Sequence, residues 1–111
     1  MESTRQKKVA RLIQKEIAEL FTLMGNGLNP GGMITVTTVR VSPDLSFAKV
    51  YLSVFKGLKA EQVIRNVEHA SKEIRLKLGN KVRHQLRIVP ELAFYLDDSL
   101  DYFERIDELL K

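Results

Sequence analysis

The chain has 111 residues, of which 44% are hydrophobic and 29% are charged, and this composition predicts a folded protein of one domain. Eighteen Lys and Arg against fourteen Asp and Glu give a net charge of +4, which favours an anionic partner. The absence of cysteine excludes disulfides, zinc fingers, iron–sulfur clusters and thiol nucleophiles. No apolar run approaches the roughly 20 residues of a membrane helix and the N-terminus has no signal-peptide pattern, so we expect a cytoplasmic protein without membrane contact.

Residues 1–24 predict a helix, with Ser3 or Thr4 as its N-cap. Its apolar residues recur at spacings of three and four, as in a helix that faces a core: Val9, Leu12, Ile13, Ile17, Leu20, Phe21 and Met24. The opposite side carries a basic ridge: Lys8, Arg11 and Lys15. Four of the six glycines lie between Gly25 and Gly32, around Pro30, and we expect the helix to stop there.

Two strands joined by a short turn are predicted next. Residues 33–41 are rich in β-branched side chains, and Ser42-Pro43-Asp44 has the proline position of a type I turn. Residues 46–55 alternate, with Ala48, Val50, Leu52 and Val54 on one face and Phe47, Lys49, Tyr51, Ser53 and Phe55 on the other. This pattern predicts a β-hairpin.

The second half of the chain predicts helical segments at 59–70 and 71–87, either as one bent helix or as two. Pro90 ends this run, residues 92–96 alternate as a third strand, and residues 97–99 offer an N-cap for an amphipathic helix over 100–110. The resulting order, α-β-β-α-(α)-β-α, predicts an α+β fold with helices on one face of a three-stranded sheet.

Charge is distributed unevenly along the chain. Residues 65–87 hold seven basic side chains against two acidic ones, whereas residues 91–111 hold seven acidic side chains against two basic ones. Such polarity would orient the protein on a phosphate chain. The alternative is that these are ordinary solvated helix faces.

Catalytic and metal chemistries find little support in the sequence. The glycine segment has Met33 where a Walker loop needs lysine, His69 and His84 lack metal-ligand spacing, and no serine lies in a Gly-x-Ser-x-Gly elbow. We therefore expect no enzyme activity, no catalytic residue, no metal and no cofactor, and a small hydrolase is the weakest alternative.

Nucleic-acid binding has more support, because the basic side chains lie on helices whose apolar sides must be buried. Phe47, Tyr51 and Phe55 share one strand face, as in a platform on which bases stack. Helices covering that face are the alternative, and the Lys/Arg-Gly-aromatic-Gly pattern of sheet-type RNA modules is absent.

Several segments together resemble a known family. They are Val9–Ile17, Val36–Tyr51 with its Ser-Pro-Asp-Leu block, Glu73-Ile74-Arg75, and Leu86–Leu100 with its Val-Pro-Glu-Leu block. In these segments the sequence resembles bacterial ribosome-binding factor A over nearly the whole chain.

The resemblance implies a single KH-like RNA-binding domain of the type II order over residues 1–111: α-β-β-α-α-β with a C-terminal helix. It further implies binding to the small ribosomal subunit and its rRNA in late maturation, with roles in rRNA processing and subunit assembly and often in growth in the cold. The family lacks the Gly-x-x-Gly loop of ordinary KH domains, as does this sequence. Its Ala-x-Gly kink corresponds here to Ala70-Ser71-Lys72, in which lysine replaces the glycine.

We therefore expect a monomeric assembly factor that holds rRNA through phosphate contacts and takes no small-molecule substrate. The expected RNA-binding residues are Lys8, Arg11, Lys15, Lys72, Arg75, Lys81, Arg83 and Arg87. The alternative is a protein–protein adaptor that docks through the hairpin edge, Met33–Val41, or through the acidic C-terminal helix.

Overall fold

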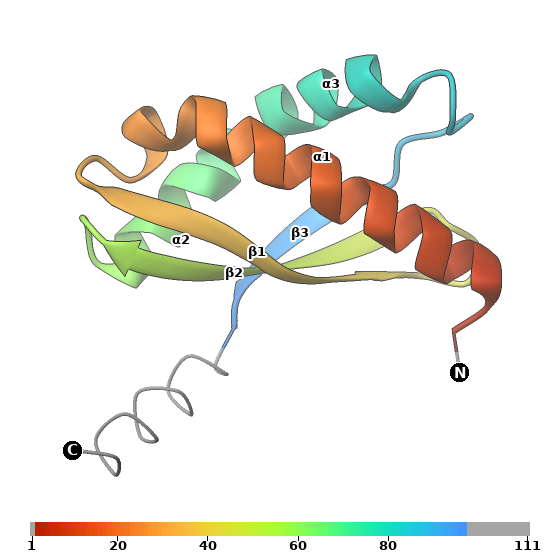
Figure 1. The fold of residues 1–111 in the computed structure, drawn as a ribbon, viewed down its shortest axis with the longest axis horizontal. Coiled ribbons are helices and arrows are strands. Elements are labelled where there is room, and N and C mark those ends of the chain that lie inside the picture. Colours follow the sequence, from red (N-terminus) through yellow and green to blue (C-terminus); the bar gives the residue numbers. More distant parts are fainter. Residues whose placement is uncertain (1, 98–111) are drawn as a thin grey trace, which may run out of the picture.

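The computed structural model describes residues 2–97, whose elements follow in the order helix, strand, strand, helix, helix, strand. Figure 1 shows two layers, with the three helices together on one face of a three-stranded sheet. The predicted α+β class and the KH-like order α-β-β-α-α-β are confirmed. The helix predicted over residues 100–110 lies outside the described residues.

Helix α1 spans Thr4–Leu28 and begins with a capping box. The Ser3 side chain accepts a hydrogen bond from the backbone N–H of Gln6, and the Gln6 side chain accepts one from the backbone N–H of Ser3. Two N–H groups that the helix cannot satisfy itself are thereby paired, which fixes where the helix starts. The prediction of an N-cap at Ser3 or Thr4 is confirmed at Ser3.

Helix α1 ends at Leu28, inside the segment Gly25–Gly32 where the sequence predicts the helix to stop and four residues beyond the span 1–24. The helix passes through Gly25 and Gly27, although each glycine disfavours a helix by about 1 kcal/mol relative to alanine. Burial of the Leu28 side chain offsets this cost, and the backbone N–H of Asn29 closes the last turn on the carbonyl of Gly25 at 2.7 Å.

Strands β1 (Gly32–Val41) and β2 (Phe47–Lys56) form the predicted antiparallel hairpin, each within one residue of its expected start. The turn between them closes through the backbone N–H of Leu45, which donates to the carbonyl of Ser42 at 2.9 Å. One extra residue, Thr37, forms a bulge in β1.

Helices α2 (Ala60–His69) and α3 (Ser71–Val82) are two separate helices, which decides the question that the sequence left open. The break falls on Ala70, whose backbone (φ −90°, ψ 5°) lies in the sparsely populated bridge region. Alanine tolerates this conformation, so the break needs no glycine. Lys72 lies inside the first turn of α3 rather than at the break.

The predicted continuation of this helix to residue 87 was wrong, because α3 ends at Val82. The segment that follows, residues 83–90, makes one further turn, in which the backbone N–H groups of Gln85 and Leu86 donate to the carbonyl of Val82. Leu86 still packs against the core. Leu86, which continues the helical spacing of apolar residues, thus reaches the core from a turn and not from a helix. We call residues 83–90 the α3–β3 loop.

Strand β3 (Glu91–Leu96) completes the sheet by pairing in parallel with β2, which makes β2 the central strand. The core lies between this sheet and the helices. Its largest fully buried side chains are Ile13, Ile17, Leu52, Ile74 and Leu78. Of the helices in residues 2–97, none combines the length and the apolar character needed to cross a membrane.

Candidate nucleic-acid interface

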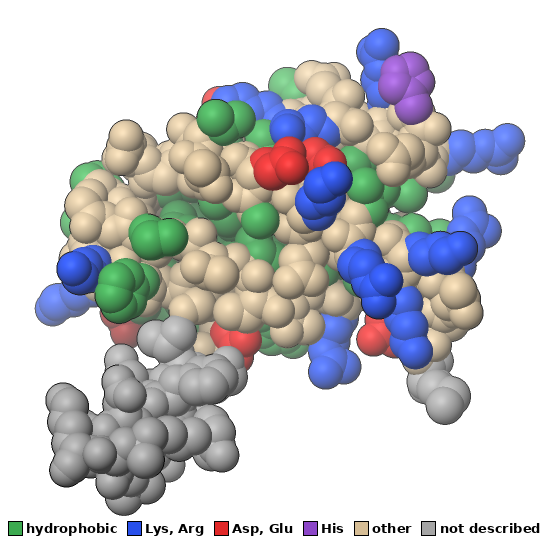
Figure 2. All heavy atoms as spheres, in the orientation of Figure 1, with side chains coloured by type: hydrophobic (Ala, Val, Ile, Leu, Met, Phe, Trp, Pro, Cys, Tyr) green, Lys and Arg blue, Asp and Glu red, His purple; other side chains and the backbone are tan. Residues whose placement is uncertain are grey.

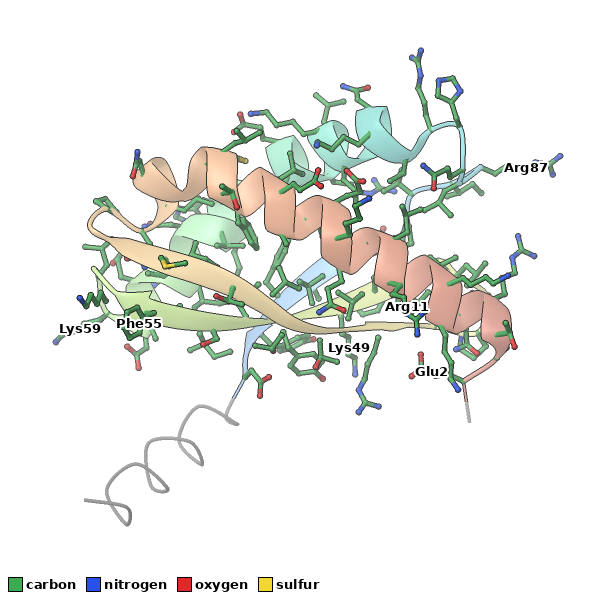
Figure 3. The ribbon with its side chains drawn as sticks, viewed as in Figure 1. Glu2, Arg11, Lys49, Phe55, Lys59 and Arg87 are labelled. Carbon is green, nitrogen blue, oxygen red and sulfur yellow. The ribbon has the colours of Figure 1, made fainter. Side chains whose placement is uncertain are left out.

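The outer side of α1 carries exposed basic side chains, because the inner side is occupied by the core residues Val9, Ile13 and Ile17. The predicted ridge residues Lys8, Arg11 and Lys15 are all exposed. Figure 3 shows Arg11 on the part of α1 nearer its N-terminus. Arg5, one turn before Lys8, belongs to the same face; the sequence analysis missed it, although its spacing from Lys8 would have identified it.

A groove lies where the start of α1, the turn between β1 and β2, and the α3–β3 loop meet. Three cations line it: Arg5, Lys8 and Arg87. We call it the basic groove. Figure 2 shows Lys and Arg side chains gathered around this end of the molecule, and Figure 3 shows Arg87 extending from it. The fold therefore brings Lys8 and Arg87, 79 positions apart in the sequence, to one hollow.

Asp44 supplies a carboxylate to the same groove. Hydrogen bonds from the side chains of Ser42 and Ser46, together with the Ser46 backbone N–H, lower its pKa from 3.8 to about 2. Asp44 is therefore ionised at any physiological pH, and it holds the hairpin turn in shape. The cations of the groove attract a phosphate, whereas the Asp44 carboxylate repels it. Together they determine where in the groove a phosphate can bind.

A second basic area lies at the start of α3, where Lys72 and Arg75 line two hollows. One hollow borders the start of β3 and also contains Glu91, and the other runs along α3 to Val89. The Arg75 guanidinium donates to the backbone carbonyls of Val89, at 2.7 Å, and Pro90, at 3.2 Å. Carbonyl oxygens carry no net charge, so Arg75 keeps its positive charge while tying the α3–β3 loop to α3. Because Pro90 also lines the basic groove, this tie connects the two basic areas.

Lys81 differs from the other expected RNA-binding residues. Its ammonium lies 3.5 Å from a carboxylate oxygen of Glu16 and 3.2 Å from one of Glu19, both on α1. The hydrogen bond to Glu19 is the main reason that the pKa of Lys81 is raised above 10.5. The carboxylates of Glu16 and Glu19 therefore balance the charge of Lys81, and these two ion pairs join α3 to α1.

The remaining expected residue, Arg83, directly follows α3 and is exposed. The structure therefore places the eight residues in three settings: α1 with the basic groove, the start of α3, and the end of α3. Lys8 and Arg87 share the basic groove, and Lys72 and Arg75 share the second area. Cations on a helix face and around a groove can contact successive phosphates of a folded polyanion.

No group of three or more potential metal ligands occurs among residues 2–97. Exposed lysine and arginine side chains support charge-assisted hydrogen bonding to anionic oxygens. The element order and the mixed sheet, together with cations around one end, define a KH-like domain with a basic surface.

Comparison with known proteins specifies the family. The model of the family described as "Ribosome-binding factor A" matches residues 5–110. The chain is 46% identical over 110 residues to ribosome-binding factor A of Cytophaga hutchinsonii, covering 99% of this chain and 83% of that one. The chain belongs to the ribosome-binding factor A family.

Two solved structures share the fold. The crystal structure of ribosome-binding factor A from Thermus thermophilus has a TM-score of 0.70 at 23% identity, over 82% of this chain and 94% of that one. A homology model of the Thermus thermophilus factor, fitted into a cryo-EM map of its complex with the 30S subunit, has a TM-score of 0.63 at 26% identity, over 76% and 86%.

Proposed function

We propose that this protein binds the small ribosomal subunit and its rRNA, and that it assists late maturation of the subunit without catalysing a reaction. Membership in a family named for ribosome binding and the 30S complex of the Thermus thermophilus relative support the partner. A protein that acts on ribosomal subunits works in the cytosol. The adaptor alternative is not favoured by any of these relatives.

The observation that carries the RNA contact is the convergence of Arg5, Lys8 and Arg87 on one groove, from two segments far apart in the chain. Solubility alone would not require cations from two segments to line the same hollow. Like charges held near one another repel, and a bound phosphate relieves that repulsion. The groove is therefore a part of the surface that a bound polyanion stabilises.

We assign phosphate contacts to the residues expected from the sequence: Lys8, Arg11, Lys15, Lys72, Arg75, Lys81, Arg83 and Arg87. Among them Lys81 contributes least, because Glu16 and Glu19 already balance its charge. Arg5 is added because it lines the groove beside Lys8.

Binding through phosphates and shape gives a simple route to release. The protein contacts an immature rRNA conformation in which phosphates lie opposite both basic areas. When the RNA folds further, the spacing of these phosphates changes and the contacts are lost together, because the Arg75 tie holds the α3–β3 loop in one position.

The test is co-sedimentation of the full chain with purified small subunits. The variant Lys8→Glu/Arg87→Glu reverses two groove charges, and we expect it to lose binding. Lys59→Glu/Arg65→Glu is the matched control, because it reverses two exposed charges at α2; Figure 3 shows Lys59 at the end of the molecule opposite to Arg87. The control should bind as the wild type does. Equal binding by both variants, with unchanged circular dichroism, would refute the groove assignment.

A further inference from the structure

The sheet face that points away from the helices has its own pattern of side chains. Within residues 2–97 all three helices lie on the opposite face, so the described helices do not cover it (Figure 1). Its members come from all three strands and include Met33, Arg40, Lys49, Tyr51, Phe55, Tyr95 and, at the start of β3, Glu91. Figure 3 shows Lys49 on this side of the sheet. Helices α1, α2 and α3 therefore do not cover the aromatic strand face.

Two tyrosines form a neighbouring aromatic pair on this face. Tyr51 and Tyr95 are direct neighbours across the parallel pair of β2 and β3. Their ring centroids lie 5.6 Å apart with 31° between the ring planes, and Tyr95 is 43% exposed. A partly exposed ring held by a neighbouring ring offers a fixed surface for another planar group, with little conformational entropy to lose on binding.

Two cations flank this aromatic pair. Arg40 and Lys49 face each other directly across the β1–β2 hairpin, and both are exposed. Like charges in this position destabilise a sheet, and neither residue forms an ion pair within the described part of the chain. They share a hollow with Thr38, Tyr51 and Asp97, where the Asp97 carboxylate accepts a hydrogen bond from the Thr37 hydroxyl.

The combination limits the chemistry of the occupant. An apolar protein surface would bury Arg40 and Lys49 without compensation, which is unfavourable. Single-stranded RNA supplies both complements, because its bases stack on aromatic rings and its phosphates neutralise cations. Lys49 and Tyr51 are two residues apart on one strand, about 7 Å, so one nucleotide segment can reach both.

We propose that this face binds a single-stranded RNA segment, with a base stacked on Tyr95 and Tyr51 and the adjacent phosphate between Arg40 and Lys49. This site is separate from the basic groove and rests on the proposed function, since it takes RNA to be the partner. It adds to that function a second contact of a different kind, which holds unpaired nucleotides rather than a folded helix.

The test is fluorescence anisotropy of the full chain with a labelled, unstructured RNA of about ten nucleotides. Tyr95→Ala should weaken binding by about 5- to 100-fold, the range typical for loss of one stacking partner. Tyr95→Phe, the matched control, keeps the ring and should bind like the wild type. Arg40→Gln/Lys49→Gln should weaken binding and reduce its salt dependence. Equal affinity of Tyr95→Ala and Tyr95→Phe would overturn the proposal.

Amide chemical-shift mapping locates the RNA and separates this proposal from the proposed function. Shifts at Tyr51 and Tyr95 are expected. Shifts confined to α1 and the α3–β3 loop would overturn the sheet-face site while leaving the basic groove in place. NOEs between the Tyr95 ring and methyl groups of residues 98–111, or saturable binding of an acidic peptide that displaces the RNA, would also overturn it. Loss of subunit binding in Lys8→Glu/Arg87→Glu tests the groove independently.

Discussion

The guanidinium Nη2 of Arg75 lies 2.7 Å from the carbonyl oxygen of Val89 and donates a hydrogen bond to it. The two residues are fourteen positions apart in the chain, so this bond fixes the α3–β3 loop against α3. The loop carries Arg87 into the basic groove. One side chain of α3 thus sets the position of a cation on another part of the surface.

Replacing Arg75 by lysine separates its two roles, because lysine keeps the charge but lacks the planar fork that reaches both carbonyls. We expect Arg75→Lys to lose about 1 kcal/mol in the free energy of unfolding, the net contribution of a typical hydrogen bond, and we expect the amides of the α3–β3 loop to exchange faster. Urea denaturation and hydrogen exchange measure the two effects. Unchanged exchange in the loop would show that Arg75 does not hold it.

Asn29 is fully buried, and its side chain joins three chain segments. Its amide nitrogen donates to the carbonyls of Met33 and Lys56, each at 3.1 Å, and its oxygen accepts from the N–H of Leu58 at 2.8 Å. Gly57, at φ +77°, passes so close that a Cβ there would lie 2.1 Å from this oxygen.

Asn29→Ala should therefore cost about 2–4 kcal/mol in the free energy of unfolding, because it removes three part-buried hydrogen bonds and leaves a cavity at a fully buried position. Urea denaturation measures the loss. Asn29→Asp should be no better, since it keeps the acceptor for Leu58 but replaces both donors with a charge. A loss below about 0.5 kcal/mol in Asn29→Ala would contradict this role.

The pairing of Lys81 with Glu16 and Glu19 predicts a pH-dependent contribution to stability. Its folded pKa is raised above 10.5, so the contribution is complete below pH 10.5 and is lost as the pH rises through the folded pKa. Lys81→Met should therefore lower the urea midpoint at about pH 8 but lose this effect at high pH. Lys77→Met is the control, because within residues 2–97 Lys77 pairs only with Glu73 on its own helix. Equal effects of the two variants would argue against a link between α1 and α3.

The hairpin turn predicts an unusually acidic carboxyl. The pKa of Asp44 should be about 2, and Ser42→Ala should move it toward 3.8. Because this pKa is depressed on folding, its contribution to stability is present above pH 3.8 and is lost as the pH falls through the folded value. Carbon-detected NMR titration of the Asp44 side chain measures its pKa in the wild type and in Ser42→Ala. A wild-type value near 3.8 would show that the serine hydroxyls do not bind this carboxylate.

The strands were predictable from the sequence because alternation and turn chemistry are local signals. Ala48, Val50 and Leu52 share one face of β2, as their spacing predicted, and all three are fully buried. Helix ends were less predictable, because distant contacts determine them. Burial of Leu28 extends α1 past two glycines, and the α3–β3 loop replaces the predicted last turn of α3 while Leu86 still reaches the core.

In the candidate site, too, features set by local sequence patterns were predictable, whereas features set by distant contacts were not. Exposure of Lys8, Arg11 and Lys15 follows from the helical period of α1 and was predictable. The pairing of Lys81 with Glu19 joins residues 62 positions apart, and no local pattern reports such a contact. The basic groove likewise needs the loop that brings Arg87 to Lys8, so its members appear in the sequence only as separate cations.

The most direct test of the account is the salt dependence of small-subunit binding. For wild type and Lys8→Gln/Arg87→Gln, the logarithm of the binding constant is measured against the logarithm of salt concentration. Loss of two phosphate contacts should make the slope shallower by about 1.5, at 0.7–0.9 per contact. Parallel slopes for the two proteins, or wild-type binding that does not respond to salt, would contradict RNA binding through the basic groove.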